Sequence, residues 1–309
     1  ESNALVEEFM LLANVTVAKL VKEHFPETAL LRRHPHPQAD DFDNLHQQLA
    51  QHDLGLDLSS PTALASSLDA CKKEDEPYFN LLTRFLAVRC MPSAEYVCAG
   101  EMESLGESHH HFGLATPIYS HFTSPIRRYA DQVVHRMAEA AIGWTKPNGS
   151  LYDAKAVSEL ARSLNERHGA AKDAERASVA LYSLMFFRGR EVVETGYATF
   201  LSSSGFNVLV PRYGIEGWVH VAPFGKSSPF RWSETERTLS AEGCLIRPMD
   251  RVTVKLRVCN ASLHPRLLME LLDDETGEPL CEMLLERGRR GSGGGSAGTP
   301  PPASEKAAA

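Results

Sequence analysis

The chain of 309 residues contains 43% hydrophobic and 23% charged residues, which is typical of a globular protein with one large domain or two domains of ordinary size. Its net charge of −8 excludes a surface that is basic all over and binds nucleic acid anywhere, so a site for a polyanion must be local. No apolar run reaches the roughly 20 residues of a membrane span, and the six cysteines form no C-x-x-C pair. We therefore expect a soluble intracellular protein with reduced thiols, no membrane contact and no zinc site.

The first predicted element is a long helix from Ser2 to about His24. Apolar residues recur at helical spacing, Ser2 can cap the N-terminus, and Pro26 ends the run. Glu7 and Asn14 are polar exceptions that lie seven residues apart, two turns along one stripe. Spacing alone favours a stripe that faces solvent or another polar helix.

Three further helices and a strand are predicted before residue 102. The helices run over about 41–52, from the region of Pro61, and over about 78–88, and the alternation in 93–101 indicates the strand. A metal cluster is one interpretation of three nearby aspartates, but we favour a role in capping the 41–52 helix. These residues are Asp40, Asp41 and Asp43.

Three consecutive histidines, at 109–111, are a second candidate metal site. Consecutive residues of a strand point to alternate faces, so the three side chains cannot easily reach one ion. We expect instead one histidine with a structural or RNA-facing role.

The second half of the chain changes from helical to strand-like near Gly189. A long helix is predicted over 151–188, and about five short alternating strands over 190–272 indicate a small closed barrel of the oligonucleotide-binding type. Residues 287–309 are rich in Gly, Ser, Pro and Ala and are predicted to be disordered. The predicted fold is thus α+β, with a mainly helical domain over 1–189, a barrel over 190–286 and the tail.

The stretch HFTSPIRRYADQVVHR, residues 121–136, carries the clearest chemical signal. Ser124 and Pro125 predict the start of a helix, whose first N–H groups and positive dipole end suit a phosphate. Arg127 would oppose that dipole unless an anion binds there, and Asp131 could hold one of the two adjacent guanidinium groups. A salt-bridged, solvated helix start is the alternative.

A longer stretch around it, HFGLATPIYSHFTSPIRRYADQVVHR at 111–136, resembles the signature of the ribonuclease II/ribonuclease R (RNB) family. Its form is most similar to that of the members associated with the eukaryotic exosome. ALVEEFMLLANVTVAKL resembles the family's preceding helix, and residues 190–272 resemble its S1 RNA-binding barrel. The resemblance implies a processive, magnesium-dependent 3′→5′ exoribonuclease that hydrolyses single-stranded RNA to nucleoside 5′-monophosphates.

The resemblance also implies roles for individual residues. Arg127 would contact the phosphate near the scissile bond and stabilise developing charge, while Ser124 and the backbone of Ile126 would hold a neighbouring phosphate. Glu7 would accept from the terminal ribose 2′-OH, which helps to separate RNA from DNA, and Glu175 would lie near the active site. Within the signature, RNA binding is also assigned to Arg128, His111 and Tyr119.

The family's magnesium-binding aspartates belong upstream of the first helix. Asp40, Asp41 and Asp43 come after that helix, so they are not that motif, and no metal ligand is assigned in this sequence. We therefore expect the C-terminal half of an exoribonuclease, inactive by itself, with exosome core subunits as partners and a nuclear and cytoplasmic location. The alternative is a non-catalytic RNA-binding fragment.

The barrel carries residues suited to single-stranded RNA. Arg212 and Tyr213, in a turn-like PRYG, and Lys255 are the preferred RNA contacts, with Arg257 near the same path. Other aromatic residues could stack on bases, although each one singly is more typical of a core. These are Phe200, Phe206 and Trp218.

Overall fold

The computed structural model describes residues 2–146, 149–222, 228–259 and 265–285. The chain divides into two compact units, Glu1–Leu181 and Tyr182–Ala309, and the division falls within one long helix. The tail predicted to be disordered from residue 287 lies outside the described residues, and the predicted domain boundary at residue 189 stays a prediction.

The first unit is mainly helical, as the sequence predicts. Helices were expected over 2–24, 41–52 and 78–88, near Pro61 and over 151–188, and each is confirmed. Its elements are α1 Ser2–His24, β1 Leu30–Arg33, α2 Ala39–Ala50, α3 Pro61–Ala70, α4 Phe79–Cys90, β2 Glu95–Cys98, α5 Ala99–Ser104, the 3₁₀ turns Phe112–Leu114 and Gly149–Tyr152, α6 Tyr129–Ala141 and α7 Ala154–Phe187.

Local capping explains where two of these helices begin. The Ser60 hydroxyl accepts the backbone N–H of Ala63 at 3.1 Å, and Pro61 occupies the first turn of α3. At α2, an Asp41 carboxylate oxygen accepts the backbone N–H of Gln38 at 3.2 Å. The capping role predicted for the aspartates is thus confirmed at Asp41.

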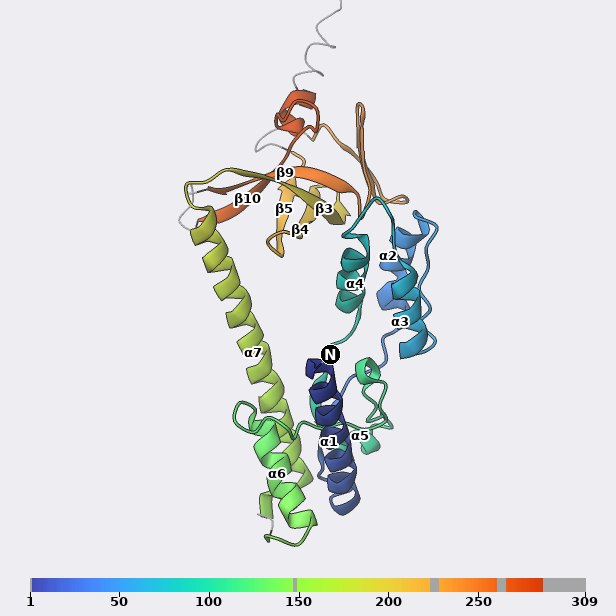
Figure 1. The fold of residues 1–309 in the computed structure, drawn as a ribbon, viewed down its shortest axis with the longest axis vertical. Coiled ribbons are helices and arrows are strands. Elements are labelled where there is room, and N and C mark those ends of the chain that lie inside the picture. The colour runs from blue at the N-terminus through green and yellow to red at the C-terminus, as the bar shows by residue number, and fades with distance from the viewer. Residues whose placement is uncertain (1, 147–148, 223–227, 260–264, 286–309) are drawn as a thin grey trace, which may run out of the picture. The chain divides into compact units, whose positions relative to one another are not determined.

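The core of the first unit forms around a short strand pair. β1 pairs antiparallel with β2, from Leu30 opposite Cys98 to Arg33 opposite Glu95. α1 and α6 contact each other (Figure 1) and share a buried cluster with these strands, including Val21 of α1 and Met137 of α6. The sequence interpretation missed β1, because its residues, LLRR, show no alternation of apolar and polar side chains.

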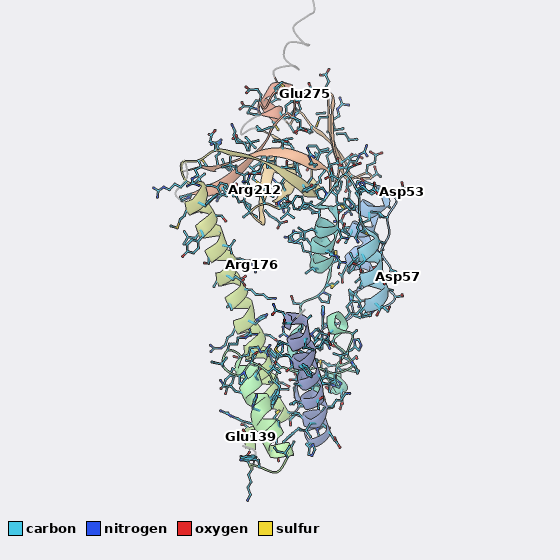
Figure 2. All side chains as sticks on the ribbon, in the orientation of Figure 1. Asp53, Asp57, Glu139, Arg176, Arg212 and Glu275 are labelled. Atoms are coloured by element: carbon cyan, nitrogen blue, oxygen red, sulfur yellow. The ribbon has the colours of Figure 1, made fainter. Side chains whose placement is uncertain are left out.

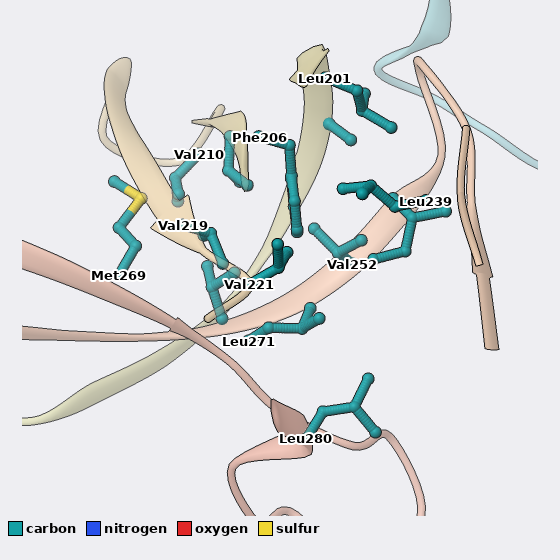
Figure 3. Packing of buried hydrophobic residues seen from close by; sticks show 14 of the residues in the cluster. Leu201, Phe206, Val210, Val219, Val221, Leu239, Val252, Met269, Leu271 and Leu280 are labelled. Carbon is teal, nitrogen blue, oxygen red and sulfur yellow. The ribbon is translucent and has the colours of Figure 1, made fainter. Parts of the chain in front are cut away.

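The second unit contains the predicted five-stranded barrel. It is closed in the order β10-β5-β4-β3-β9 (Figure 1), and its interior is filled by residues such as Phe206, Val219 and Met269 (Figure 3). A small sheet, β6-β7-β8, was not predicted. The strands are β3 Val192–Ser202, β4 Gly205–Val210, β5 Ile215–His220, β6 Arg231–Ser233, β7 Thr238–Ala241, β8 Cys244–Ile246, β9 Arg251–Cys259 and β10 Arg266–Leu271. None of the described helices has the length and apolar character needed to span a membrane.

Candidate nucleic-acid interface

Residues 124–128 form a turn that precedes α6, and this corrects the sequence interpretation. The helix expected to begin at Ser124 begins at Tyr129. The backbone N–H groups of Arg127 and Arg128 both donate to the Ser124 carbonyl, at 3.2 and 3.1 Å, and Arg128 then adopts an extended backbone. The prediction that Ser124 caps a helix whose dipole serves a phosphate is therefore wrong, because Arg127 lies before the helix.

Asp131 explains why the chain turns here, because it contacts both ends of the turn. Its side chain is fully buried, and one carboxylate oxygen accepts the Ser124 N–H at 2.7 Å. The Arg128 guanidinium donates to both carboxylate oxygens, at 2.7 Å each. The predicted carboxylate–guanidinium pair is thus made by Arg128, whose RNA-binding role stays a prediction.

Asn14 of α1 fixes the segment that leads into the turn. Its Oδ1 accepts the backbone N–H groups of Phe122 and Thr123, at 2.9 and 3.2 Å, and its Nδ2 donates to the Tyr119 hydroxyl at 2.9 Å. Asn14 is 3% exposed and bonds residues outside any helix, so the expectation of a stripe that faces solvent or another polar helix is wrong at this residue, whereas Glu7 is exposed. The Phe122 ring also stacks on His135, with ring centroids 4.1 Å apart.

The tip of the turn is exposed between these two supports. Ile126 is 95% exposed, and Arg127 is also exposed. Across the described part of the chain, the Arg127 guanidinium makes no hydrogen bond or ion pair. An unpaired cation on a turn held at both ends is available for an anionic ligand without reorganisation of its backbone.

A buried polar cluster, consisting of Arg32, Tyr96, His111, Tyr119 and His121, lies near Arg128. The Arg32 guanidinium is 4.5 Å from the centre of the Tyr96 ring, and its Nη1 has no hydrogen-bond partner. Burial lowers the pKa of Arg32. Sequence reasoning did not single out Arg32, although an arginine directly after the apolar run Ala29–Leu31 is a signal for a buried cation.

The histidines of this cluster are neutral at neutral pH. Burial, followed by the neighbouring His34 and Arg32, lowers the pKa of His111 to about 4. Burial, followed by Arg128 and Arg32, lowers the pKa of His121 to about 3. His111 and Tyr119, assigned to RNA from the sequence, are 9% and 6% exposed, and their rings contact each other.

Glu7, Arg127 and Glu175 are all exposed on the first unit. The described contacts include no hydrogen bond or ion pair that joins any two of them. Beside Glu175 on α7, Arg176 (Figure 2) is paired with Asp173. The catalytic assignments of Glu7 and Glu175 therefore stay predictions from the sequence.

In the barrel, Arg212 and Tyr213 share one carboxylate. Arg212 (Figure 2) donates to Glu194 at 2.6 Å, and the Tyr213 hydroxyl donates to the same oxygen at 3.1 Å. The Tyr213 ring also packs edge-on against Phe187, with ring centroids 5.1 Å apart. Arg212 is thus exposed and oriented, while Tyr213 supports the barrel core.

A row of side chains crosses three neighbouring barrel strands. Phe200 on β3 lies opposite Asn207 on β4, which lies opposite Trp218 on β5. The Phe200 and Trp218 rings are 6.4 Å apart, and Trp218 is also 6.4 Å from His220. Sequence reasoning missed Asn207 and His220, and it could have found them by aligning the alternating positions of β4 and β5.

A groove of about 680 Å³ adjoins this row and includes Trp218, His220, Lys255 and Arg257 in its lining. Its cations have acidic neighbours: Lys255 is 3.9 Å from Glu270, and the Arg257 Nε donates to Glu270 at 3.0 Å. The groove is therefore amphipathic rather than strongly basic, and it suits stacked bases better than a bare phosphate.

No group of three or more His, Cys, Asp or Glu side chains converges as a metal site among the residues that the structure describes. The described residues therefore do not fit a magnesium centre.

Comparison with known proteins identifies relatives of most of the chain. Mouse "Exosome complex exonuclease RRP44" is 41% identical over 278 residues, which are 89% of this chain and 29% of the relative. The Arabidopsis thaliana "Exosome complex exonuclease RRP44 homolog A" is 45% identical over 288 residues, which are 92% of this chain and 29% of the relative. The chain thus spans about three tenths of the length of these relatives.

Solved structures share the fold at low sequence identity. The apo form of Mycoplasma genitalium RNase R aligns with a TM-score of 0.68 at 21% identity, covering 83% of this chain and 39% of that one. Yeast Ssd1, a pseudonuclease, aligns with a TM-score of 0.69 at 20% identity, covering 87% of this chain and 44% of that one. Residues 1–143, which include Asn14 and the whole 124–128 turn, match the RNB domain. An RNB domain therefore covers residues 1–143, just under half of the chain.

Proposed function

We propose that this chain is part of a 3′→5′ exoribonuclease that acts on single-stranded RNA. The observation that carries the proposal is Arg127, whose exposed guanidinium has no partner among the described residues, on a turn that Asp131 holds at both ends and that Asn14 holds at the segment before it. Its setting is that of a preorganised group that stabilises charge on a phosphate during hydrolysis. The relatives named as exosome complex exonucleases support this assignment.

Within this proposal, the 124–128 turn binds two neighbouring phosphates. Arg127 contacts the phosphate next to the scissile bond, and Ser124 together with the Ile126 backbone holds the adjacent one. The Ser124 N–H already donates to Asp131, which leaves its hydroxyl for the phosphate. The products are nucleoside 5′-monophosphates.

Carboxylates supply selectivity for RNA in this proposal. Glu7 is exposed on α1, the helix that also provides Asn14. A carboxylate there can accept a hydrogen bond from a ribose 2′-OH, which DNA lacks. Glu175 is assigned a supporting role near the reacting phosphate.

The barrel supplies a second contact with RNA. Phe200 and Trp218 offer aromatic faces in one row, and bases of any sequence can stack on such faces. Arg212 and Lys255 provide cations for the backbone, with Tyr213 beside Arg212. This arrangement favours single strands, whose bases are free to stack.

Three further proposals follow from the family resemblance. Magnesium is the proposed metal of the reaction, with no ligand assigned among the described residues. Exosome core subunits are the proposed protein partners, and the nucleus and cytoplasm are the proposed locations.

A non-catalytic RNA-binding role is the second candidate function. The observation in its favour is that the same fold occurs in yeast Ssd1, a pseudonuclease, so the fold alone does not imply cleavage. Under this proposal, Arg127 and the barrel bind RNA while no bond is broken.

One experiment separates the two candidates. A single-stranded RNA labelled at its 5′ end is incubated with the chain and magnesium, beside Arg127→Ala and the matched control Arg136→Ala, which removes another exposed arginine. A ladder that shortens from the 3′ end, and is lost only in Arg127→Ala, supports the nuclease. Intact RNA with binding weakened only in Arg127→Ala supports the binding role for this chain by itself, and the same result is expected if the metal ligands of the nuclease lie outside it. RNA that is neither cleaved nor bound contradicts both.

A further inference from the structure

We infer that Asn14 is a positioning residue that fixes where Arg127 stands. This inference rests on the proposed function, in which Arg127 contacts a phosphate. Asn14 is buried in α1, 108 positions before Phe122, yet it hydrogen-bonds the segment that leads into the 124–128 turn. None of the hydrogen bonds that the structure describes for Asn14 reaches the exposed tip, so its effect on RNA must pass through the turn.

The backbone around Phe122 needs the acceptor that Asn14 provides. Residues 122 and 123 lie outside every helix and strand, so no regular ladder pairs their N–H groups. The Asn14 Oδ1 accepts both, and the bond from its Nδ2 to the Tyr119 hydroxyl keeps the amide in the orientation that presents the oxygen. The Asn14 side chain thus accepts the two N–H groups that a helix or strand would otherwise pair.

The same contact links two parts of the proposed site. Glu7 lies on α1 seven residues before Asn14, which corresponds to about 10 Å along the helix axis. Asn14 therefore ties the helix that carries Glu7 to the turn that carries Arg127. Asp131 holds both ends of that turn, through the Ser124 N–H and the Arg128 guanidinium, but none of these described hydrogen bonds reaches α1, so they do not set this spacing.

Amide hydrogen exchange tests the positioning role without any RNA. In the full chain, Asn14→Ala should make exchange at Phe122 and Thr123 about tenfold faster, because each N–H loses an acceptor. Tyr119→Phe keeps the acceptor but removes its orienting partner, so it should give a smaller increase at the same amides. Asn14→Asp retains an acceptor oxygen and should keep exchange at these two amides near the wild-type rate. This variant still tests the role of the acceptor if Asn14→Ala does not fold. Unchanged exchange in Asn14→Ala, or exchange in Asn14→Asp as fast as without the side chain, would overturn the inference.

A double-mutant cycle tests whether Asn14 acts through Arg127. The probe is a fluorescently labelled oligouridine, and the variants are Asn14→Ala, Arg127→Ala and the double variant. Arg127→Ala should weaken binding about tenfold or more, as expected for loss of a charged hydrogen bond. Asn14→Ala should also weaken binding in the wild-type background. In the Arg127→Ala background the same change should weaken binding by less than about twofold, whereas two independent effects would multiply. Multiplied effects would overturn the coupling.

The two measurements separate failure of this inference from failure of the proposed function. If Arg127→Ala binds RNA like the wild type, the proposed function fails, and with it the link from Asn14 to RNA. Faster exchange at Phe122 and Thr123 in Asn14→Ala would still show that Asn14 holds the turn.

Discussion

Arg127 and Arg128 are neighbours in sequence but have opposite surroundings. The Arg128 guanidinium pairs with Asp131, whose side chain is fully buried, while Arg127 is exposed and unpaired in the described chain. Removing one partner of a buried pair leaves an uncompensated charge, so Arg128→Met should lower the free energy of unfolding by about 3 kcal/mol. Arg127→Met should change it by less than about 0.5 kcal/mol. Urea unfolding measures both, and equal losses would contradict this assignment of roles.

His111 and His121 make the stability of the first unit sensitive to acid. Burial and basic neighbours lower their pKa values to about 4 and about 3 in the folded state. An unfolded histidine has a pKa near about 6.5, so between roughly pH 6.5 and pH 4 the unfolded chain binds more protons than the folded one. The free energy of unfolding should therefore keep its full value above about pH 6.5 and fall as the pH decreases below it.

Unfolding of the wild type and His121→Asn over this pH range checks the effect. Asparagine can retain a hydrogen bond to the Tyr96 hydroxyl, which lies 2.8 Å from the histidine Nδ1. In His121→Asn, the slope of the free energy of unfolding against pH should be lower than in the wild type by at most about 1.4 kcal/mol per pH unit. An unaltered slope would show that His121 does not contribute.

At the scale of elements, the predictions from sequence succeed where a period is long enough to be seen. The helix over 2–24 and the barrel strands have such periods, and both are confirmed. The helix predicted from Ser124 fails, because the local cap signal is outweighed by Asp131, which takes the Ser124 N–H and the Arg128 guanidinium. That contact depends on burial, which a cap pattern does not reveal.

The hairpin between β3 and β4 depends on Gly205. Its φ is +153°, and an added Cβ would collide with the Val219 carbonyl oxygen. Gly214 also has a positive φ, of +63°, but the position that an added Cβ would take there has open space around it. Gly205→Ala should therefore destabilise the barrel by roughly 2–3 kcal/mol through strain and overlap, and Gly214→Ala by about 1 kcal/mol through strain alone. Thermal unfolding of the two variants compares them, and the reverse order would contradict the packing described here.

At the scale of the whole molecule, a chain with a net charge of −8 can bind RNA only if its phosphate contacts are few and local. Each phosphate contact made on a single strand contributes about 0.7 to the slope of log affinity against log salt concentration. Arg127→Ala should therefore reduce the magnitude of that slope by about 0.7, because one phosphate contact is lost. Arg136→Ala removes the same charge from another exposed position and should leave the slope unchanged.

The comparison distinguishes a contact from a general effect of charge. If both variants lower the slope equally, the RNA responds only to the summed field of the molecule, and the 124–128 turn has no special role. A slope that is unchanged in both, with affinity still reduced in Arg127→Ala, would mean that Arg127 contacts a base or a sugar. Only a change confined to Arg127→Ala is consistent with a phosphate held by this turn on an otherwise acidic protein.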